Sequence, residues 1–361
     1  MTQAPPAPDE LEPTPPGDVA TRGGGSGRTA IALLDRSWLF LFLLALLGFF
    51  WATTPRDTFL TEANLSQIAL STSQVVLLAI GLTFVIVTGG IDLSIGGILF
   101  FSAVCGGRTM LELAGTNAQV TSGVYPHAAK AIVAGIVVAL LAGTFWGVVN
   151  GLLITLMRLP PFIVTLGTYG MTFGFGNLLS GGSYLGAPVP TGLTSDFGNA
   201  KFLGVYYPMW LALGFLLVAH IVFQYARFGR YTRAVGSNAE GSRRAGIAVN
   251  RHLVKVYALA GFLAGLAGVL DLAIYTNTTS VSHLQDNLNA ISAVVLGGTS
   301  LFGGIGSVLM SSVGAFIPTV LQNGLVIRNV QPFWQEVTVG ATIILAVYLD
   351  QLRRRRSAGG G

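Results

Sequence analysis

Asp92 and Ser94 are the residues whose types and positions most suggest chemistry, because they interrupt an apolar stretch. That stretch runs from Val85 to Leu99 with the sequence VIVTGGIDLSIGGIL. A carboxylate at membrane depth costs about 3 kcal/mol on insertion scales and often marks a transport pathway. The structural alternative is that Asp92 caps the helix that follows, since Asp is a favoured N-cap residue. The sequence leaves both roles open.

Glycine pairs lie beside these polar residues and recur late in the chain. Gly89 and Gly90 precede the first polar residue, and Gly297 and Gly298 belong to a related stretch, VVLGGTSLFGGIGS, at 294–307. Irregular backbone at membrane depth is tolerated only where protein or a water-filled cavity satisfies its polar groups. Two glycine-interrupted apolar segments in the two halves of a chain are typical of transporters built from repeats. We therefore predict two broken helices that face the inside of a bundle.

Other polar residues lie inside two later apolar segments. Thr165 and Thr168 share one helical face with Thr172, at spacings of three and four residues. Such a face either forms hydrogen bonds between helices, which is the commoner case, or lines a path for a hydroxylated solute. The candidate residues in these segments are Asn150, Thr165, Thr168 and Asn177.

The sequence contains no catalytic or metal-binding motif. The four histidines have no metal-ligand spacing among themselves or with Cys105. No G-x-x-x-x-G-K-[ST] motif is present, so the chain is not expected to bind ATP by a P-loop. We expect a protein that is not an enzyme and binds no metal or cofactor, and any ATP hydrolysis that drives it requires another polypeptide.

Composition identifies a membrane protein. The chain has 361 residues, of which 52% are hydrophobic and only 10% are charged, whereas soluble domains have about 25% charged residues. Its net charge of +5 comes from a few basic clusters that follow topology rules, so we expect contact with membrane lipid and none with nucleic acid. The proline-rich segment 1–34 is predicted to be a disordered cytoplasmic tail, followed by a transmembrane domain at 35–352 and a basic, glycine-rich tail at 353–361.

Ten apolar segments define the predicted all-α architecture. They lie at about 38–54, 65–88, 93–113, 128–157, 162–180, 205–225, 254–275, 290–302, 307–327 and 333–350. The eighth is shorter than the roughly 17 residues that usually cross a bilayer. Counting it as a crossing places both termini in the cytoplasm with the basic loop 226–253, as the positive-inside rule requires. The fold prediction is a polytopic bundle in which spans 2–5 and 7–10 are inverted repeats.

The basic loop contains one candidate helix. Ser237 and Glu240 have the spacing of a capping box, which predicts a short helix from Ala239 to Ala245 that stops at Gly246. Two interpretations are open at this point. The arginines either fix only the topology of a solvated loop, or the helix docks a cytoplasmic partner.

Six stretches together resemble one known family. They are VTGGIDLSIGG at 87–97, NGLLITLMRLPPFIVTLGT at 150–168, AVGSNAEGSRRAGI at 234–247, VYALAGFLAGLAGVL at 256–270, AVVLGGTSLFGGIGSVL at 293–309 and PFWQEVTVG at 332–340. In this order they resemble the permease subunits of bacterial ABC sugar importers of the ribose, xylose and galactose type. The resemblance covers about 60–350.

This resemblance implies a function and a set of partners. The chain would be a multi-pass permease of the bacterial inner membrane that translocates a pentose or hexose. A cytoplasmic ABC ATPase would hold ATP and Mg²⁺, a periplasmic or lipid-anchored binding protein would deliver the sugar, and a second copy or a sister permease would complete the channel. The residues that would couple to the ATPase are Ser237, Asn238, Ala239, Glu240, Arg243, Arg244 and Gly246.

The chain departs from the family pattern in two places. Asn287 and Asn289 stand where family members often have an acidic pair, and Asp271 and Tyr275 stand where small residues are more usual. The alternatives are an ion-coupled secondary transporter that uses Asp92, an ABC permease for nucleosides or branched-chain amino acids, and a membrane scaffold without transport.

Overall fold

A computed structural model describes residues 25–182, 185 and 187–358. Of the predicted tails, 1–24 and 359–361 therefore lie outside the described residues, and the first described helix begins at Gly25. Seven helical segments in the described residues are long and apolar enough to cross a membrane, with 308–327 counted as one segment. The chain is thus a mostly helical, polytopic membrane protein, as the composition predicts.

Helices overlap all ten predicted apolar segments, but in the eighth, 290–302, the helix ends at Leu296. The first half contains α1 (Gly25–Thr53), α2 (Glu62–Val87), α3 (Ile95–Ala114), α4 (Asn117–Thr121), α5 (Ala128–Leu156), α6 (Pro161–Ser180) and α7 (Thr191–Leu193). A π-helical turn (Thr194–Gly198) and a two-stranded antiparallel hairpin, β1 (Lys201–Phe202) and β2 (Val205–Tyr206), lead into the second half. That half contains α8 (Tyr207–Tyr225), α9 (Arg227–Ser237), α10 (Ala239–Arg244), α11 (Val249–Tyr275), a 3-10 turn η2 (Ser280–His283), α12 (Asp286–Leu296), α13 (Val308–Gly314), α14 (Phe316–Ile327) and α15 (Pro332–Ala358).

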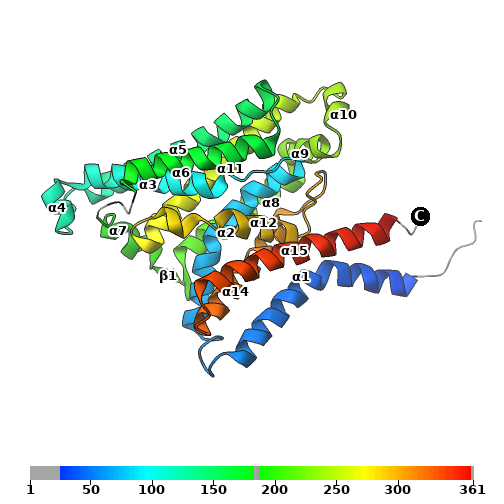
Figure 1. Cartoon of the computed structure of the whole chain (residues 1–361), viewed down its shortest axis with the longest axis horizontal. Helices are drawn as coiled ribbons and strands as arrows, with labels where there is room; N and C mark the ends of the chain where they lie inside the picture. Colours follow the sequence, from blue (N-terminus) through cyan, green and yellow to red (C-terminus); the bar gives the residue numbers. More distant parts are fainter. Residues whose placement is uncertain (1–24, 183–184, 186, 359–361) are drawn as a thin grey trace, which may run out of the picture. The chain divides into compact units, whose positions relative to one another are not determined.

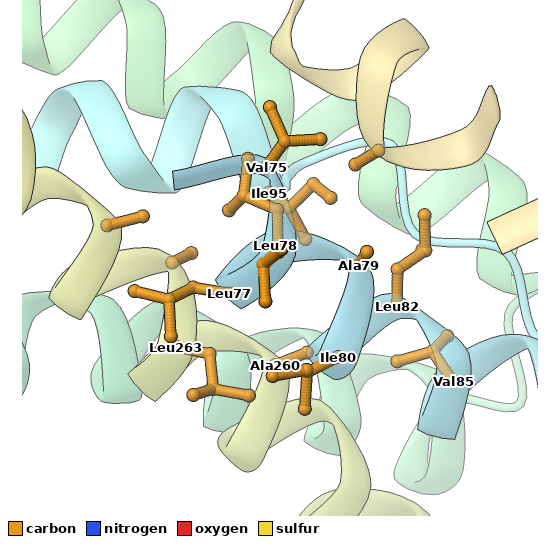
Figure 2. Close-up of a cluster of buried hydrophobic side chains, with 14 of the residues drawn as sticks. Val75, Leu77, Leu78, Ala79, Ile80, Leu82, Val85, Ile95, Ala260 and Leu263 are labelled. Atoms are coloured by element: carbon orange, nitrogen blue, oxygen red, sulfur yellow. The ribbon is translucent and has the colours of Figure 1, made fainter. Parts of the chain in front are cut away.

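Helix α2 is the centre of the compact unit 39–361. In its most apolar window 89% of the residues are buried inside the protein, so α2 faces other helices and hardly any lipid. Thr61 caps its N-terminus by accepting a hydrogen bond from the backbone N–H of Asn64 at 3.2 Å. Figure 2 shows the α2 side chains from Val75 to Val85 packed with Ile95 of α3 and with Ala260 and Leu263 of α11.

Small residues bring α5 and α11 into backbone contact. A Cβ atom added at Gly143 of α5 would lie 2.8 Å from the Cα of Gly265 on α11 and closer still to the carbonyl oxygen of Gly261. Gly147 and Gly151, which follow on the same face at intervals of four, contact α11 in the same way. This is the small-residue packing expected between membrane helices, where close backbone approach gives the van der Waals energy.

Irregular backbone follows two of the helices, at the two glycine stretches. Helix α2 ends at Val87, and an irregular segment, 88–94, connects it to α3. Helix α12, the predicted eighth span, has only 11 residues and is followed by the irregular segment 297–307 before α13. Within 39–361, α4 and α7 lie at one end, and α9 and α10 lie at the opposite end (Figure 1).

Candidate translocation and coupling sites

A chain of buried hydrogen bonds connects the first irregular segment to α5 and α6. The Oδ1 atom of Asp92 accepts hydrogen bonds from the backbone N–H of Ser94 at 2.8 Å and from its hydroxyl at 2.6 Å. The amide of Asn150 donates to Ser94 Oγ at 2.8 Å and accepts from the hydroxyl of Thr168 at 2.7 Å. The four side chains are at most 2% exposed, so this network, which we call the break network, ties three segments together inside the protein.

The threonines of α6 face this network. Thr165 donates to the carbonyl oxygen of Ile91 at 3.2 Å. The hydroxyl of Thr172 occupies the space that a side chain at Gly97 would need. The predicted common face therefore exists, and its observed contacts are hydrogen bonds and packing between segments of the chain.

Two buried polar atoms beside the break network have no hydrogen-bond partner within the described part of the chain. They are Oδ2 of Asp92 and the hydroxyl of Tyr257 on α11. The Tyr257 hydroxyl lies 2.6 Å from the position of a Cβ atom at Gly90, so Gly90 provides the room for it. An unpaired buried polar group of this kind costs about 1–3 kcal/mol.

The prediction that Asp92 caps the third helix is wrong in its detail. The N-cap residue of α3 is Ser94, and the first turn is capped from a distant helix. Asn287 of α12 accepts from the backbone N–H of Gly96 at 2.7 Å and donates to the carbonyl oxygen of Leu93 at 2.6 Å. Because an amide both accepts and donates, Asn287 makes a pair of bonds that a carboxylate could not make.

The short helix in the basic loop forms where it is expected, but the predicted capping box is wrong. Helix α9 extends through Ser237, whose hydroxyl donates back to the carbonyl oxygen of Arg233 at 2.9 Å. The N-cap of α10 is Asn238, which has an extended backbone and accepts from the N–H of Gly241 at 2.8 Å. Gly246 follows the helix with a φ of 83°, a conformation suited to glycine after a helix end.

The charged residues of α10 pair with each other at the surface. Glu240 lies 3.5 Å from Arg243 and 3.4 Å from Arg244, and all three side chains are more than half exposed. Exposed pairs of this kind contribute little to stability. Ala239 is the first residue of the helix. The exposed charges are therefore available to a partner.

The end of α9 contacts both glycine stretches, and we call this contact the hinge junction. Gly304 donates its backbone N–H to the carbonyl oxygen of Val87 at 2.8 Å. A Cβ atom at Gly236 would lie 2.7 Å from the nitrogen of Gly304 and closer to the oxygen of Val87. One at Gly304 would lie 2.7 Å from the hydroxyl oxygen of Ser237. Ser237, the first residue of the predicted coupling segment, therefore contacts the second glycine stretch, and its neighbour Gly236 contacts both.

The remaining candidate residues are three glycines just after helix ends and Asn177. Gly89 has a φ of 81° just after α2, and Gly298 has a φ of 79° just after α12, so both occupy left-handed turns. Gly297 packs against the backbone of Ser311 on α13. Asn177 lies near the end of α6, where its carbonyl oxygen accepts from the N–H of Gly182 at 2.7 Å. The structure does not bring Asn177 into the break network.

A polar cavity of about 430 Å³ was not predicted from the sequence. It lies among α2, α11, η2, α12, α14 and α15, and we call it the acidic pocket. Its polar lining comprises Ser71, Gln74, Asp271, Tyr275, Asn277, Ser282, His283, Gln285, Asp286, Asn289, Thr319, Gln322 and Gln335. Two signals in the sequence point to it: Gln74 and Asp271 interrupt apolar helices, and Asp271, Tyr275 and Asn289 depart from the family pattern. The sequence does not show that α2, which carries Gln74, lies beside η2 and α12.

His283 forms the floor of the acidic pocket between two carboxylates. Its Nδ1 lies 2.8 Å from Oδ2 of Asp286, and its Nε2 lies 3.3 Å from Oδ2 of Asp271 and 2.9 Å from the hydroxyl of Thr278. Burial opposes protonation, but the two carboxylates outweigh it and raise the pKa of His283 to about 10. The imidazole is therefore positively charged at neutral pH, and it fixes both carboxylates in place. Within the described residues no group of three or more His, Cys, Asp or Glu is arranged to hold a metal ion.

Comparisons with known proteins agree on one family. Residues 64–347 match the model of the family described as "Branched-chain amino acid transport system / permease component". The chain is 34% identical to the ribose import permease protein of Escherichia coli over 330 residues, which cover 88% of this chain and 96% of that protein.

Two other relatives show the same extent of similarity. The chain is 32% identical to the galactose/methyl galactoside import permease protein of Haemophilus influenzae, covering 89% of this chain and 95% of that protein. It is 33% identical to the D-allose transport system permease protein of Escherichia coli, covering 88% and 92%. No solved structure matches the chain.

Proposed function

The chain belongs to the family of branched-chain amino acid transport system permease components, and from this membership we propose that it is the permease of an ABC importer that moves a monosaccharide across the bacterial inner membrane. Relatives named for ribose, galactose and allose are about one-third identical over nearly their whole length, which supports a pentose or hexose as the solute. A nucleoside or branched-chain amino acid is the alternative solute within the same class.

The hinge junction is the observation in the structure that best supports coupling to an ATPase. The exposed helix α10 follows α9 directly, and the last turn of α9 contacts both irregular segments through Gly236 and Ser237. A force applied to α10 from the cytoplasm would therefore reach α2 and the segment before α13. Rigid elements that pivot at a few irregular residues are a common basis of alternating access.

The proposed partners follow from this arrangement. A separate ATPase would bind ATP and Mg²⁺ and receive α10 with its exposed Glu240, Arg243 and Arg244. A binding protein would deliver the sugar at the opposite end of the bundle. A second copy of this chain, or a sister permease, would supply the other half of the channel. The chain itself would perform no chemistry.

The proposed topology has ten crossings with both termini in the cytoplasm. Seven helices meet the length and hydropathy of a membrane span, and the apolar part of α1, the short α12 and α15 would supply the other three. The concentration of arginines in α9 and α10 supports a cytoplasmic position for that end of the bundle. Each of the two inverted repeats would then contain one irregular, glycine-rich segment, 88–94 or 297–307, at which its helices could move.

The main alternative is an ion-coupled transporter centred on Asp92. Its support is the second carboxylate oxygen, Oδ2, which is buried and has no partner within the described residues. The break network gives the other oxygen a structural role. Transport that stops when ion gradients collapse would favour this alternative.

Co-purification tests the proposed function. The tagged permease would be extracted from its native membrane in a mild detergent and analysed by mass spectrometry. We expect an ATPase subunit to accompany it, and Arg244→Glu to reduce the recovered ATPase while the permease stays folded. Arg56→Glu, at an exposed position in the connection between α1 and α2, is the control. Recovery of the permease alone in several detergents would contradict the proposal.

A further inference from the structure

The acidic pocket has the size and the mixture of groups of a small-molecule site. Its volume of about 430 Å³ lies within the range of roughly 300–1,000 Å³ for such sites. Its walls come from five helices, α2, α11, α12, α14 and α15. Its floor is held rigid by His283 and its three hydrogen-bonding partners. Groups held in this way bind a ligand at low entropic cost.

Polar groups that face the pocket retain unused hydrogen-bonding capacity. Gln74 donates to Oδ1 of Asp271 at a long 3.4 Å, and no described contact engages its carbonyl oxygen. Gln322 donates to Oδ1 of Asn289 at 3.2 Å, which leaves its own carbonyl oxygen and the Asn289 NH₂ group without a described partner. These groups present both donors and acceptors, which is the requirement for binding hydroxyl groups.

The charge of the pocket selects against anions. Two carboxylates and one protonated imidazole give it a net charge of about −1, and no described lining residue is Arg or Lys. The imidazole is already paired with both carboxylates, and it is only 4% exposed. A carboxylate or phosphate group would therefore enter without a counter-charge, and burying an unpaired charge is strongly unfavourable. A neutral polyhydroxylated molecule meets no such penalty.

We propose that the acidic pocket is a solute site within the permease itself, which binds a neutral monosaccharide through Gln74, Asn289 and Gln322 and excludes amino acids and phosphorylated sugars. Tyr275, a residue that is about half exposed, forms an aromatic wall beside these groups. The inference rests on the proposed import of a monosaccharide. It adds that the permease, and not only the binding protein, recognises the solute.

Direct binding without the binding protein tests this inference. The permease–ATPase complex would be purified from its native membrane, placed in lipid nanodiscs and titrated with tritiated D-ribose, D-galactose, D-allose or L-arabinose. The probe is the sugar whose ATP-driven uptake the same cells show, and tritiated leucine is tested in parallel. We expect saturable binding of the sugar and none of leucine.

Variants of the two glutamines identify the site. Gln74→Met and Gln322→Met keep the length of the side chain and remove its polar atoms, so each should weaken the Kd about fivefold, the effect of one lost hydrogen bond of ~1 kcal/mol. Gln224→Met on the exposed end of α8 is the matched control and should leave the Kd unchanged.

The outcomes separate this inference from the proposed function. Three results would overturn the assignment of the solute site. They are the absence of saturable sugar binding, the same Kd in Gln74→Met and Gln322→Met as in the control Gln224→Met, and saturable binding of leucine. If ATP-driven sugar uptake persists in that case, the importer proposal stands and only the pocket assignment fails. Absence of ATP-driven uptake of all four sugars would instead count against the importer proposal.

Discussion

Gly236→Ala is the substitution that most selectively disturbs the hinge junction. Gly236 lies in the last turn of α9 and its φ is not positive, so alanine suits its backbone. The added Cβ atom, however, would collide with the carbonyl oxygen of Val87 and lie 2.7 Å from the nitrogen of Gly304. Those two atoms share a hydrogen bond of 2.8 Å, so the methyl group must separate them.

The expected magnitude follows from three contributions. Overpacking at a backbone contact costs about 1–3 kcal/mol, and the lost hydrogen bond adds ~1 kcal/mol. Replacing glycine by alanine within a helix returns about 0.5–1 kcal/mol. The net strain of about 1–3 kcal/mol falls on the contact between α9 and the two irregular segments. If that contact transmits the movement of the ATPase to the permease, the amount of sugar taken up per ATP hydrolysed should fall by about 5-fold to 150-fold.

The assay compares transport with ATP hydrolysis in the same complex. The purified permease–ATPase complex is reconstituted in proteoliposomes with binding protein and sugar, and sugar uptake per ATP hydrolysed is measured. Gly214→Ala on α8 is the control, because a Cβ atom there meets nothing within 4 Å. Wild-type coupling in Gly236→Ala, with the assembly intact, would refute the assignment of the hinge junction. An equal loss in Gly214→Ala would show that the effect is not local.

Three further predictions concern packing, the break network and pH. Gly261→Ala should lower the stability of the permease in thermal unfolding by about 1–3 kcal/mol because α5 leaves no room for a methyl group, whereas Gly170→Ala, which meets nothing within 4 Å, should be neutral or stabilising; equal effects would contradict the close packing. Asn150→Leu should cost about 1–3 kcal/mol in the same assay, because Ser94 and Thr168 lose their shared partner, and an unchanged melting temperature would show that the network adds nothing. Because the folded-state pKa of His283 is raised to about 10, the stability it provides is complete below about pH 6.5 and is lost as the pH rises through 10. Between pH 6.5 and 10 the melting temperature should therefore fall more steeply with pH in the wild type than in His283→Gln. Equal slopes in the two proteins would contradict the ion pairing of His283 with the two carboxylates.

Hydropathy alone predicted the positions of the helices well, because burial in lipid and the bundle requires long apolar runs. Hydropathy could not decide the number of membrane spans, because α12 is as apolar as a span but has only 11 residues. The capping residue at α10 was misassigned by one position because nothing in the sequence shows that α9 continues through Ser237. Helix propensity is local, whereas the point at which two short helices separate depends on tertiary contacts.

The two polar sites differ in how much of them the sequence reveals. Asp92 and Ser94 are adjacent in the chain, and their partner Asn150 was singled out as a polar residue in an apolar segment. The acidic pocket was missed because Gln74, Asp271 and His283 come from three elements, and only the fold brings them together. Asn287 and Asn289 were recognised as departures from the family pattern, but their roles in capping α3 and in the pocket depend on long-range contacts.

The most direct test of the central claim is the energy source of sugar uptake. The complex purified from its native membrane is reconstituted in proteoliposomes with ATP enclosed, and the binding protein and labelled sugar are added outside. The account predicts accumulation that requires the enclosed ATP and continues after ionophores collapse the ion gradients. Accumulation that needs no ATP and stops when the gradients collapse would contradict an ABC permease and favour ion coupling through Asp92.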